Sequence, residues 1–154
     1  MGPETYESAL SFVQDIIATE GPFDACIGFS QGAVLLSTLI IAHQREHPFE
    51  QDLFKMAVFF SGSCPFQLDD YGQWSPIDPT TMKKGKIRIP TTHIYGIKDD
   101  IAKECSKLVE CCEPSVRAVY KHEFGHEIPH RPISVVEGMA KAVQKSVRNA
   151  RFGM

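Results

Sequence analysis

Three residues in this sequence could together activate an alcohol for attack on a carbonyl carbon: Ser30, Asp99 and His126. A serine hydroxyl is a weak nucleophile until a neighbouring base takes its proton, which a histidine oriented by a carboxylate does near neutral pH. The chain order of serine, acid and histidine is the one expected when the serine follows a strand in a G-x-S-x-G turn. The sequence therefore predicts a Ser-Asp-His triad assembled from distant parts of the chain.

The serine occupies the centre of the stretch GFSQG, residues 28–32. In a nucleophile elbow a strand turns abruptly into a helix, so the residues two before and two after the serine must be almost free of side chains. The N–H of Gln31, at the start of that helix, would point to the position of a developing oxyanion. The alternative is a glycine-rich turn with an incidental serine, and the apolar strand and helix patterns on either side argue against it.

Two carboxylates, Asp99 and Asp100, follow the strand pattern TTHIYG. Asp99 is favoured as the triad acid because it lies three residues after Gly96, within the turn, whereas Asp100 is placed to cap the next helix. The two roles could be exchanged. His126 follows the next strand, and Gly125 beside it lets the loop bring the imidazole over the end of the sheet.

The same histidine belongs to the stretch HEIPH, residues 126–130, which has the spelling of a zinc-binding H-E-x-x-H helix. That motif needs a helix to bring its two histidines to one metal ion. Pro129 disfavours a helix because it lacks an N–H and clashes with the preceding turn. We therefore expect a loop, no metal and no cofactor. A zinc site at His122, His126 and His130 is the less favoured alternative.

The elements that must position these residues alternate along the chain. Apolar residues at helical spacing predict helices, and short apolar runs between turn residues predict strands. The predicted strands are 25–29, 56–62, 91–96 and 118–124, and the predicted helices are 3–20, 30–47, 100–112 and one that begins at 133. This order predicts a single α/β domain, residues 1–154, with a parallel sheet of about four strands flanked by helices and working residues at the carboxyl ends of the strands.

Residues 63–89 are predicted to form a loop rich in proline, glycine and aspartate. A loop of this length is more often functional than a plain connection. We expect Ser63, Phe66 and Trp74 from this segment, together with Phe29 beside the nucleophile, to line a substrate site. Core packing is an equally good explanation for the phenylalanines.

Composition argues against several other functions. A net charge of −3 without a basic cluster predicts no binding to nucleic acid, and no apolar run is long enough to cross a bilayer. The N-terminus has no basic stretch followed by an apolar one, so we expect a cytoplasmic protein. The five cysteines, an odd number, suit buried thiols better than disulfides or a zinc ribbon.

The stretches EGPFDACIGFSQGA, THIYGIKDDI and HEFGHEIPH resemble the nucleophile, acid and histidine segments of the FSH family of serine hydrolases, in the α/β-hydrolase superfamily. The resemblance covers about Gly2 to Ala150, and it implies Ser30 as nucleophile, Asp99 as orienting acid and His126 as base. It also implies a small-molecule ester or acyl-thioester substrate. Some family members release acyl chains from carrier proteins of fungal polyketide synthases, so a carrier protein is one expected partner.

Members of this family begin with a strand and a His-Gly loop that donates the second oxyanion N–H, and nothing in this chain corresponds to them. The resemblance therefore implies a partial α/β-hydrolase fold, as a truncated gene product, a fragment, or a chain completed by a partner or by self-association. The serine-bearing strand would lie at an exposed sheet edge, which invites pairing with a second copy or another chain. The alternative function is an impaired hydrolase that acts as an interaction or dimerisation module, because loss of one oxyanion donor lowers turnover by about 100- to 1000-fold.

Overall fold

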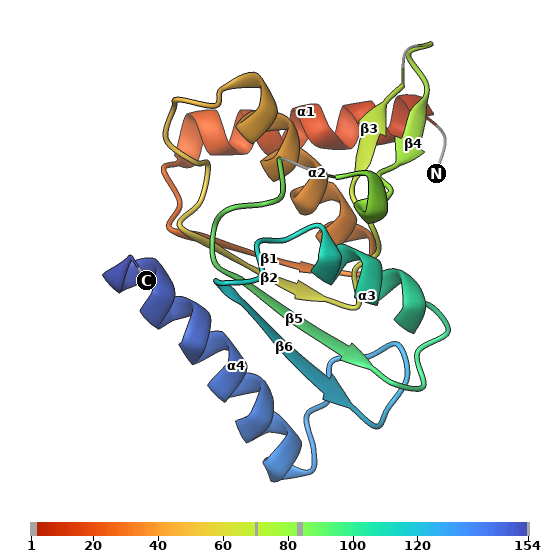
Figure 1. Cartoon of the computed structure of the whole chain (residues 1–154), viewed down its shortest axis with the longest axis vertical. Helices are drawn as coiled ribbons and strands as arrows, with labels where there is room; N and C mark the ends of the chain where they lie inside the picture. The colour runs from red at the N-terminus through yellow and green to blue at the C-terminus, as the bar shows by residue number, and fades with distance from the viewer. Residues whose placement is uncertain (1–2, 70, 83–84, 154) are drawn as a thin grey trace.

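The computed structural model of the chain describes residues 3–69, 71–82 and 85–153. Helices and strands alternate along the chain, except for a two-stranded insertion after the second strand (Figure 1). In chain order the elements are α1 (Pro3–Glu20), β1 (Ala25–Phe29), α2 (Gln31–Glu46), β2 (Met56–Phe60), β3 (Phe66–Leu68), β4 (Trp74–Pro76), the 3-10 turn η1 (Pro79–Thr81), β5 (Thr91–Gly96), α3 (Ala102–Glu110), β6 (Arg117–His122) and α4 (Ile133–Phe152).

Four strands form one parallel sheet in the order β1-β2-β5-β6. The helices α1, α2 and α3 lie on one side of this sheet and α4 lies on the other, which gives three layers (Figure 1). This architecture confirms the predicted α/β fold with a four-stranded parallel sheet. Because all four strands run in the same direction, their carboxyl ends meet at one edge of the molecule.

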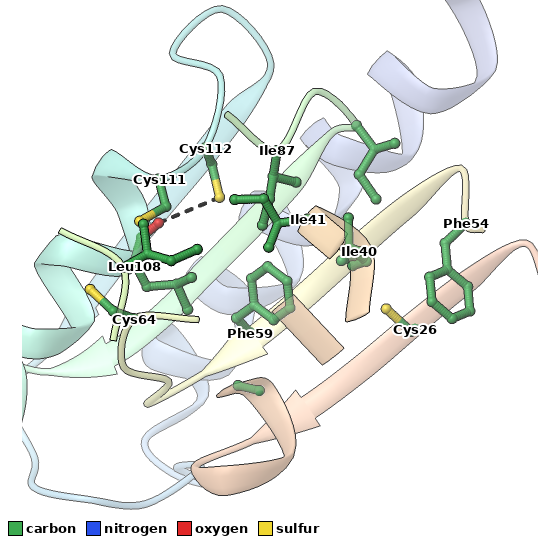
Figure 2. Packing of buried hydrophobic residues seen from close by; sticks show 14 of the residues in the cluster. Cys26, Ile40, Ile41, Phe54, Phe59, Cys64, Ile87, Leu108, Cys111 and Cys112 are labelled. Carbon is green, nitrogen blue, oxygen red and sulfur yellow. Dashed lines mark hydrogen bonds between the residues drawn. The ribbon is translucent and has the colours of Figure 1, made fainter. Parts of the chain in front are cut away.

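The larger part of the core lies between the sheet and the helices α2 and α3 (Figure 2). Phe59 of β2 is buried in one cluster with Ile40 and Ile41 of α2 and Leu108 of α3. Full burial of an apolar side chain of this size contributes about 1.5 to 3 kcal/mol. This cluster therefore fixes α2, the helix that follows Ser30, firmly against the sheet. The five cysteines are free and buried, as the sequence predicts.

The opposite face of the sheet packs against α4. Met139 of α4 is buried in one cluster with Val58 of β2 and Ile94 of β5, and Val136 and Val143 lie partly buried there. Since α4 begins a few residues after His126, this packing anchors the far end of the histidine loop.

The segment 63–89, predicted as a loop, contains structure of its own. Strands β3 and β4 form an antiparallel pair, and the turn η1 follows them. A strand of three residues is too short to show a clear alternation of apolar and polar positions, so the sequence pattern did not indicate this hairpin. No helix in the described ranges is long and apolar enough to cross a membrane.

Candidate active site

Ser30 lies in the tight turn between β1 and α2. Its backbone has φ 54° and ψ −119°, in the left-handed region that is strained for a residue other than glycine. The Ser30 N–H donates to the Phe60 carbonyl at 2.8 Å, and the Ser30 carbonyl accepts from the Ala33 N–H at 3.0 Å, so backbone bonds hold the turn on both sides. A serine before a helix usually caps the helix with its hydroxyl, but this one makes no capping bond. The conformation thus leaves Oγ free for another partner.

The two glycines of the elbow have different roles. A Cβ at Gly28 would lie 2.6 Å from the Ala33 nitrogen, so a larger residue would push α2 away from the strand. A Cβ at Gly32 would meet no atom within 4 Å. The prediction that both positions must lack a side chain is therefore confirmed for Gly28 and wrong for Gly32.

Asp99 lies in the turn after β5, with its side chain only 1% exposed. Burial alone would raise the pKa of this carboxyl, but the Ile101 N–H donates to Oδ1 at 3.0 Å, and this bond together with His126 and Ser61 lowers the pKa. The side chain is therefore a carboxylate at neutral pH. Asp100 is exposed, and α3 has Ile101 at its N-cap without a side-chain cap, so the capping role predicted for Asp100 is wrong.

Ser61 is a neighbour of Asp99 that the sequence pattern did not indicate. It follows β2 with φ 46° and is 1% exposed. Its hydroxyl makes no hydrogen bond of good geometry in the described structure, yet it lies close enough to Asp99 to help lower the pKa of that carboxyl. A serine followed by glycine at the carboxyl end of a strand was the signal that could have identified this residue.

His126 joins the serine to the acid. Its Nε2 lies 2.8 Å from Ser30 Oγ, and its Nδ1 lies 2.8 Å from Asp99 Oδ2. Because an ionised carboxylate can only accept a hydrogen bond, Nδ1 carries the proton and Nε2 is left to accept from the serine hydroxyl. The imidazole is 38% exposed, so the hydrogen bonds run from a buried acid to a base that water reaches. The three residues predicted from the sequence are thus in direct contact.

The loop that carries His126 packs closely on the turn that carries Asp99. A Cβ at Gly96 would collide with the carbonyl oxygens of Phe124 and Gly125, so the two segments meet only because residue 96 is glycine. In addition, the Lys98 N–H donates to the Phe124 carbonyl at 3.2 Å. These contacts set the distance between the acid and the base.

Residues 126–130 form a loop, as Pro129 predicts, and α4 begins only at Ile133. His122 is 2% exposed, burial lowers its pKa, and its Nδ1 accepts from the Phe124 N–H at 3.3 Å. His130 is exposed. Both ring nitrogens of His126 are engaged by Ser30 and Asp99, so in this arrangement His126 offers no nitrogen to a metal ion.

Gln31 is the first residue of α2. The N–H groups in the first turn of a helix have no acceptor within that helix, and the positive end of the helix dipole lies in the same place. The Gln31 N–H is therefore available, directly beside Ser30, for an oxygen on the carbon under attack. The oxyanion role of this N–H stays a prediction.

Of the predicted substrate-binding residues, Phe29 lies at the triad. Its ring centroid is 5.1 Å from that of His126, and the side chain is 41% exposed. Ser63 is partly exposed in the segment between β2 and β3. Phe29 therefore lies beside the imidazole that contacts Ser30.

The other two predicted residues pack on α1. The ring centroids of Phe66 and Trp74 lie 5.5 and 5.0 Å from that of Tyr6, and Trp74 Nε1 donates to Glu7 at 3.1 Å. Their contacts attach the β3–β4 hairpin to α1. None of these contacts of Phe66 and Trp74 involves a residue of the triad.

A parallel sheet with a nucleophile elbow after one strand, an acid after a later one and a histidine after the last defines an α/β-hydrolase. The chain belongs to the serine hydrolase (FSH1) family, which it matches over residues 3–135. The match includes all three triad positions.

Fungal relatives support this assignment. The chain is 36% identical to esterase FPY3 of Fusarium mangiferae over 98% of this chain and 70% of the relative. It is 32% identical to hydrolase phiM of Talaromyces stipitatus over 84% of this chain and 52% of the relative. It is also 32% identical to esterase FUS5 of Gibberella fujikuroi, over 79% of this chain and 46% of the relative. The chain thus spans about half the length of the last two relatives.

Solved structures share the fold at low sequence identity. A monoacylglycerol lipase of Paleococcus ferrophilus superposes with a TM-score of 0.60 at 14% identity, over 93% of this chain and 75% of that one. A fungal esterase of Rhizomucor miehei gives a TM-score of 0.60 at 14% identity, over 99% of this chain and 61% of that one.

Proposed function

We propose that this chain hydrolyses ester or thioester bonds through an acyl intermediate on Ser30. The observation that carries the proposal is the unbroken relay from Asp99 through His126 to Ser30, with both hydrogen bonds 2.8 Å long. The names of the relatives FPY3 and FUS5, both esterases, support an ester as substrate.

The proposed reaction has two halves. Ser30 Oγ attacks the carbonyl carbon while His126 Nε2 takes the hydroxyl proton, and the Gln31 N–H donates to the oxygen that becomes negative. His126 then gives the proton to the leaving alcohol or thiol, and the carbon–oxygen or carbon–sulfur bond breaks to leave acyl-Ser30. In the second half, water attacks the acyl group with His126 as base, the carboxylic acid leaves and Ser30 regains its proton. Asp99 stays ionised and stabilises the imidazolium formed in both halves.

On the substrate side, Phe29 is the proposed contact for the acyl or leaving group, because it is exposed next to the His126 ring. Ser63, Phe66 and Trp74 stay predictions as substrate contacts, and the packing on Tyr6 explains the position of Phe66 and Trp74 equally well. An acyl chain delivered on a carrier protein, and a location in the cytoplasm, also stay predictions.

A matched pair of substrates tests this function and separates its two forms. An alkyl ester and a thioester of the same acyl chain are offered to the wild type and to Ser30→Ala. We expect wild-type turnover of at least one substrate and loss of that turnover in Ser30→Ala. Turnover that survives in Ser30→Ala would remove Ser30 from the reaction, and the ratio of kcat/KM for the two substrates assigns esterase or thioesterase specificity.

A second candidate function is an interaction or dimerisation module with impaired catalysis. The exposed strand β1 favours it, since Ile27 in the middle of this strand is 69% exposed. A folded wild type that turns over neither substrate yet self-associates would support this candidate.

A further inference from the structure

A second serine with a strained backbone lies one strand away from the nucleophile. In the described ranges Ser30 and Ser61 are the two residues other than glycine with positive φ, at 54° and 46°. They occupy equivalent places, because the Ser30 N–H donates to Phe60 of the neighbouring strand at 2.8 Å and the Ser61 N–H donates to Ile94 of the next strand at 2.9 Å. Strain of this kind is found mostly at functional sites. At Ser30 it belongs to the nucleophile elbow, whereas at Ser61 it needs a reason of its own.

Close packing fixes the segment that contains Ser61. A Cβ at Gly62 would lie 2.5 Å from the Ala33 side chain and 3.0 Å from a methyl group of Leu108, so the chain here passes tightly between α2 and α3. Ser61 itself is 1% exposed. Because α3 begins just after the turn that holds Asp99, this packing keeps the Ser61 segment beside that turn.

The Ser61 hydroxyl is buried, and it makes no hydrogen bond of good geometry in the described structure. A buried hydroxyl without a partner is costly, so most such groups have one. Asp99 is an acceptor beside it: burial raises the pKa of this carboxyl, and the contact with Ser61 is one of those that lower it. Each carboxylate oxygen can accept more than one hydrogen bond, and the bonds from Ile101 and His126 use one position on each. The carboxylate can therefore accept from Ser61 as well.

We propose that Ser61 is a positioning residue for the hydrolysis proposed above: its hydroxyl donates to the Asp99 carboxylate and holds it in the orientation in which it accepts from His126 Nδ1. Ser61 acts only through Asp99 and transfers no proton itself. This role explains why a serine stands at a position where glycine would be unstrained. The inference rests on the proposed function, since the orientation of the acid matters to turnover only when His126 serves as the base.

Two replacements separate the hydroxyl from the strain. Ser61→Ala removes the hydroxyl and keeps the strain, whereas Ser61→Gly removes both, because glycine adopts a φ of 46° freely. We expect kcat/KM to fall by about 10-fold in both variants, since each loses a hydrogen bond to a charged group. Ser61→Gly should nevertheless have the higher Tm of the two. A kcat/KM near the wild-type value in Ser61→Gly would overturn the proposal.

A double-mutant cycle tests whether Ser61 acts through the acid. In the Asp99→Asn background, Ser61→Ala should lower kcat/KM little further, because the charged acceptor is already gone. Ser146→Ala is the matched control: it removes another buried hydroxyl, which donates to the Thr91 carbonyl at 3.0 Å, and it should lower Tm without changing kcat/KM. A loss from Ser61→Ala that is equally large in both backgrounds would show a purely structural role and overturn the proposal.

Titration of the Asp99 carboxyl by carbon-13 NMR tests the contact without turnover. A donor to the charged form lowers the pKa of a carboxyl, so the pKa of Asp99 should be higher in Ser61→Ala than in the wild type and unchanged in Ser146→Ala. The Asp99 resonance is identified by its absence from the spectrum of Asp99→Asn. An Asp99 pKa that is the same in Ser61→Ala as in the wild type would overturn the role of Ser61. A wild type without ester or thioester turnover would instead overturn the proposed function, so the two failures can be told apart.

Discussion

Asp99 and His126 differ in their contact with water, and this difference supports the roles proposed for them. Asp99 is 1% exposed and holds its charge through donated hydrogen bonds, while the His126 side chain is 38% exposed. A buried, ionised acid can orient the imidazole and stabilise its charge without taking the proton itself. The exposed end of the relay is then the place where we propose that a substrate carbonyl meets Ser30 Oγ.

Replacement of the two neighbouring aspartates separates their roles. Asp99→Asn removes the acceptor for Nδ1–H and allows the wrong tautomer of His126, so we expect kcat to fall by about 1000- to 10,000-fold. Asp100→Asn is the control, because Asp100 is exposed and has no contact with His126 in the described structure, and its kcat should stay near the wild-type value. Similar losses in both variants would contradict this assignment of the acid.

The lowered pKa of Asp99 predicts how stability depends on pH. A carboxyl whose pKa is lower in the folded state stabilises the fold fully above its unfolded pKa, about 3.9, and loses that contribution as the pH falls through the lower folded value. We therefore expect the difference in Tm between wild type and Asp99→Asn to be larger at pH 7 and to shrink below about pH 4. Thermal unfolding at pH 7, 4 and 3 measures it, and a difference that grows toward acid pH would refute the direction of the shift.

At the scale of elements, the junction of β1 and α2 determines the position of the nucleophile. Gly28→Ala would place a methyl group against Ala33, and overpacking of this kind destabilises by about 1 to 3 kcal/mol. Gly32→Ala should be neutral or stabilising by up to about 1 kcal/mol, because its Cβ meets no atom and alanine is the better helix former. Denaturant unfolding of both variants checks the contrast. Equal destabilisation would show that residue 32 is also closely packed.

The β3–β4 hairpin is attached to α1 through Trp74. Trp74→Phe removes the donor to Glu7 and keeps much of the ring packing on Tyr6, so we expect a loss of about 0.5 to 1.5 kcal/mol. The KM for a short ester should not change, because Trp74 contacts α1 and not the triad. A raised KM at unchanged Tm would instead assign Trp74 to the substrate.

The longer helices and strands could be predicted from the sequence. The three-residue strands and the first residue of α3 could not. The helix over residues 3–20 and the strands 25–29 and 91–96 have the predicted bounds, because the helix shows a helical period and each strand is a run bounded by turn residues. The three-residue strands of the hairpin lack such a pattern. The predicted start of α3 at residue 100 was too early. Aspartate is a common capping residue, but the N–H of Ile101 at the start of the helix donates to Asp99 Oδ1 and not to Asp100.

At the scale of the whole molecule, the parallel sheet brings together residues that are far apart in the chain. Ser30 and His126 are 96 positions apart, yet each follows the carboxyl end of a strand, and those ends share one edge. The chain order of elbow, acid and histidine was therefore enough to predict that these three side chains meet. The sequence could not show that Ser61 lies beside Asp99 or that Gly96 sets the spacing of two loops, because these contacts depend on tertiary packing.

The strand order also explains the path of the loop that carries His126. In the order β1-β2-β5-β6 the nucleophile strand is at the edge, and the acid and histidine follow the two strands at the other side of the sheet. The loop after β6 must therefore reach back across the strand ends to bring His126 to Ser30. Its packing on Gly96 and on Lys98 holds it in that position.

The most direct test of the account is covalent labelling of the serine. A fluorophosphonate probe reacts with a serine only when a neighbouring base has activated it. Intact-mass spectrometry with peptide mapping should find one adduct, on Ser30 of the wild type and of the control Ser63→Ala, and none on Ser30→Ala. A folded wild type that takes up no probe, or a Ser30→Ala variant labelled as fully as the wild type, would contradict the claim that this relay activates Ser30.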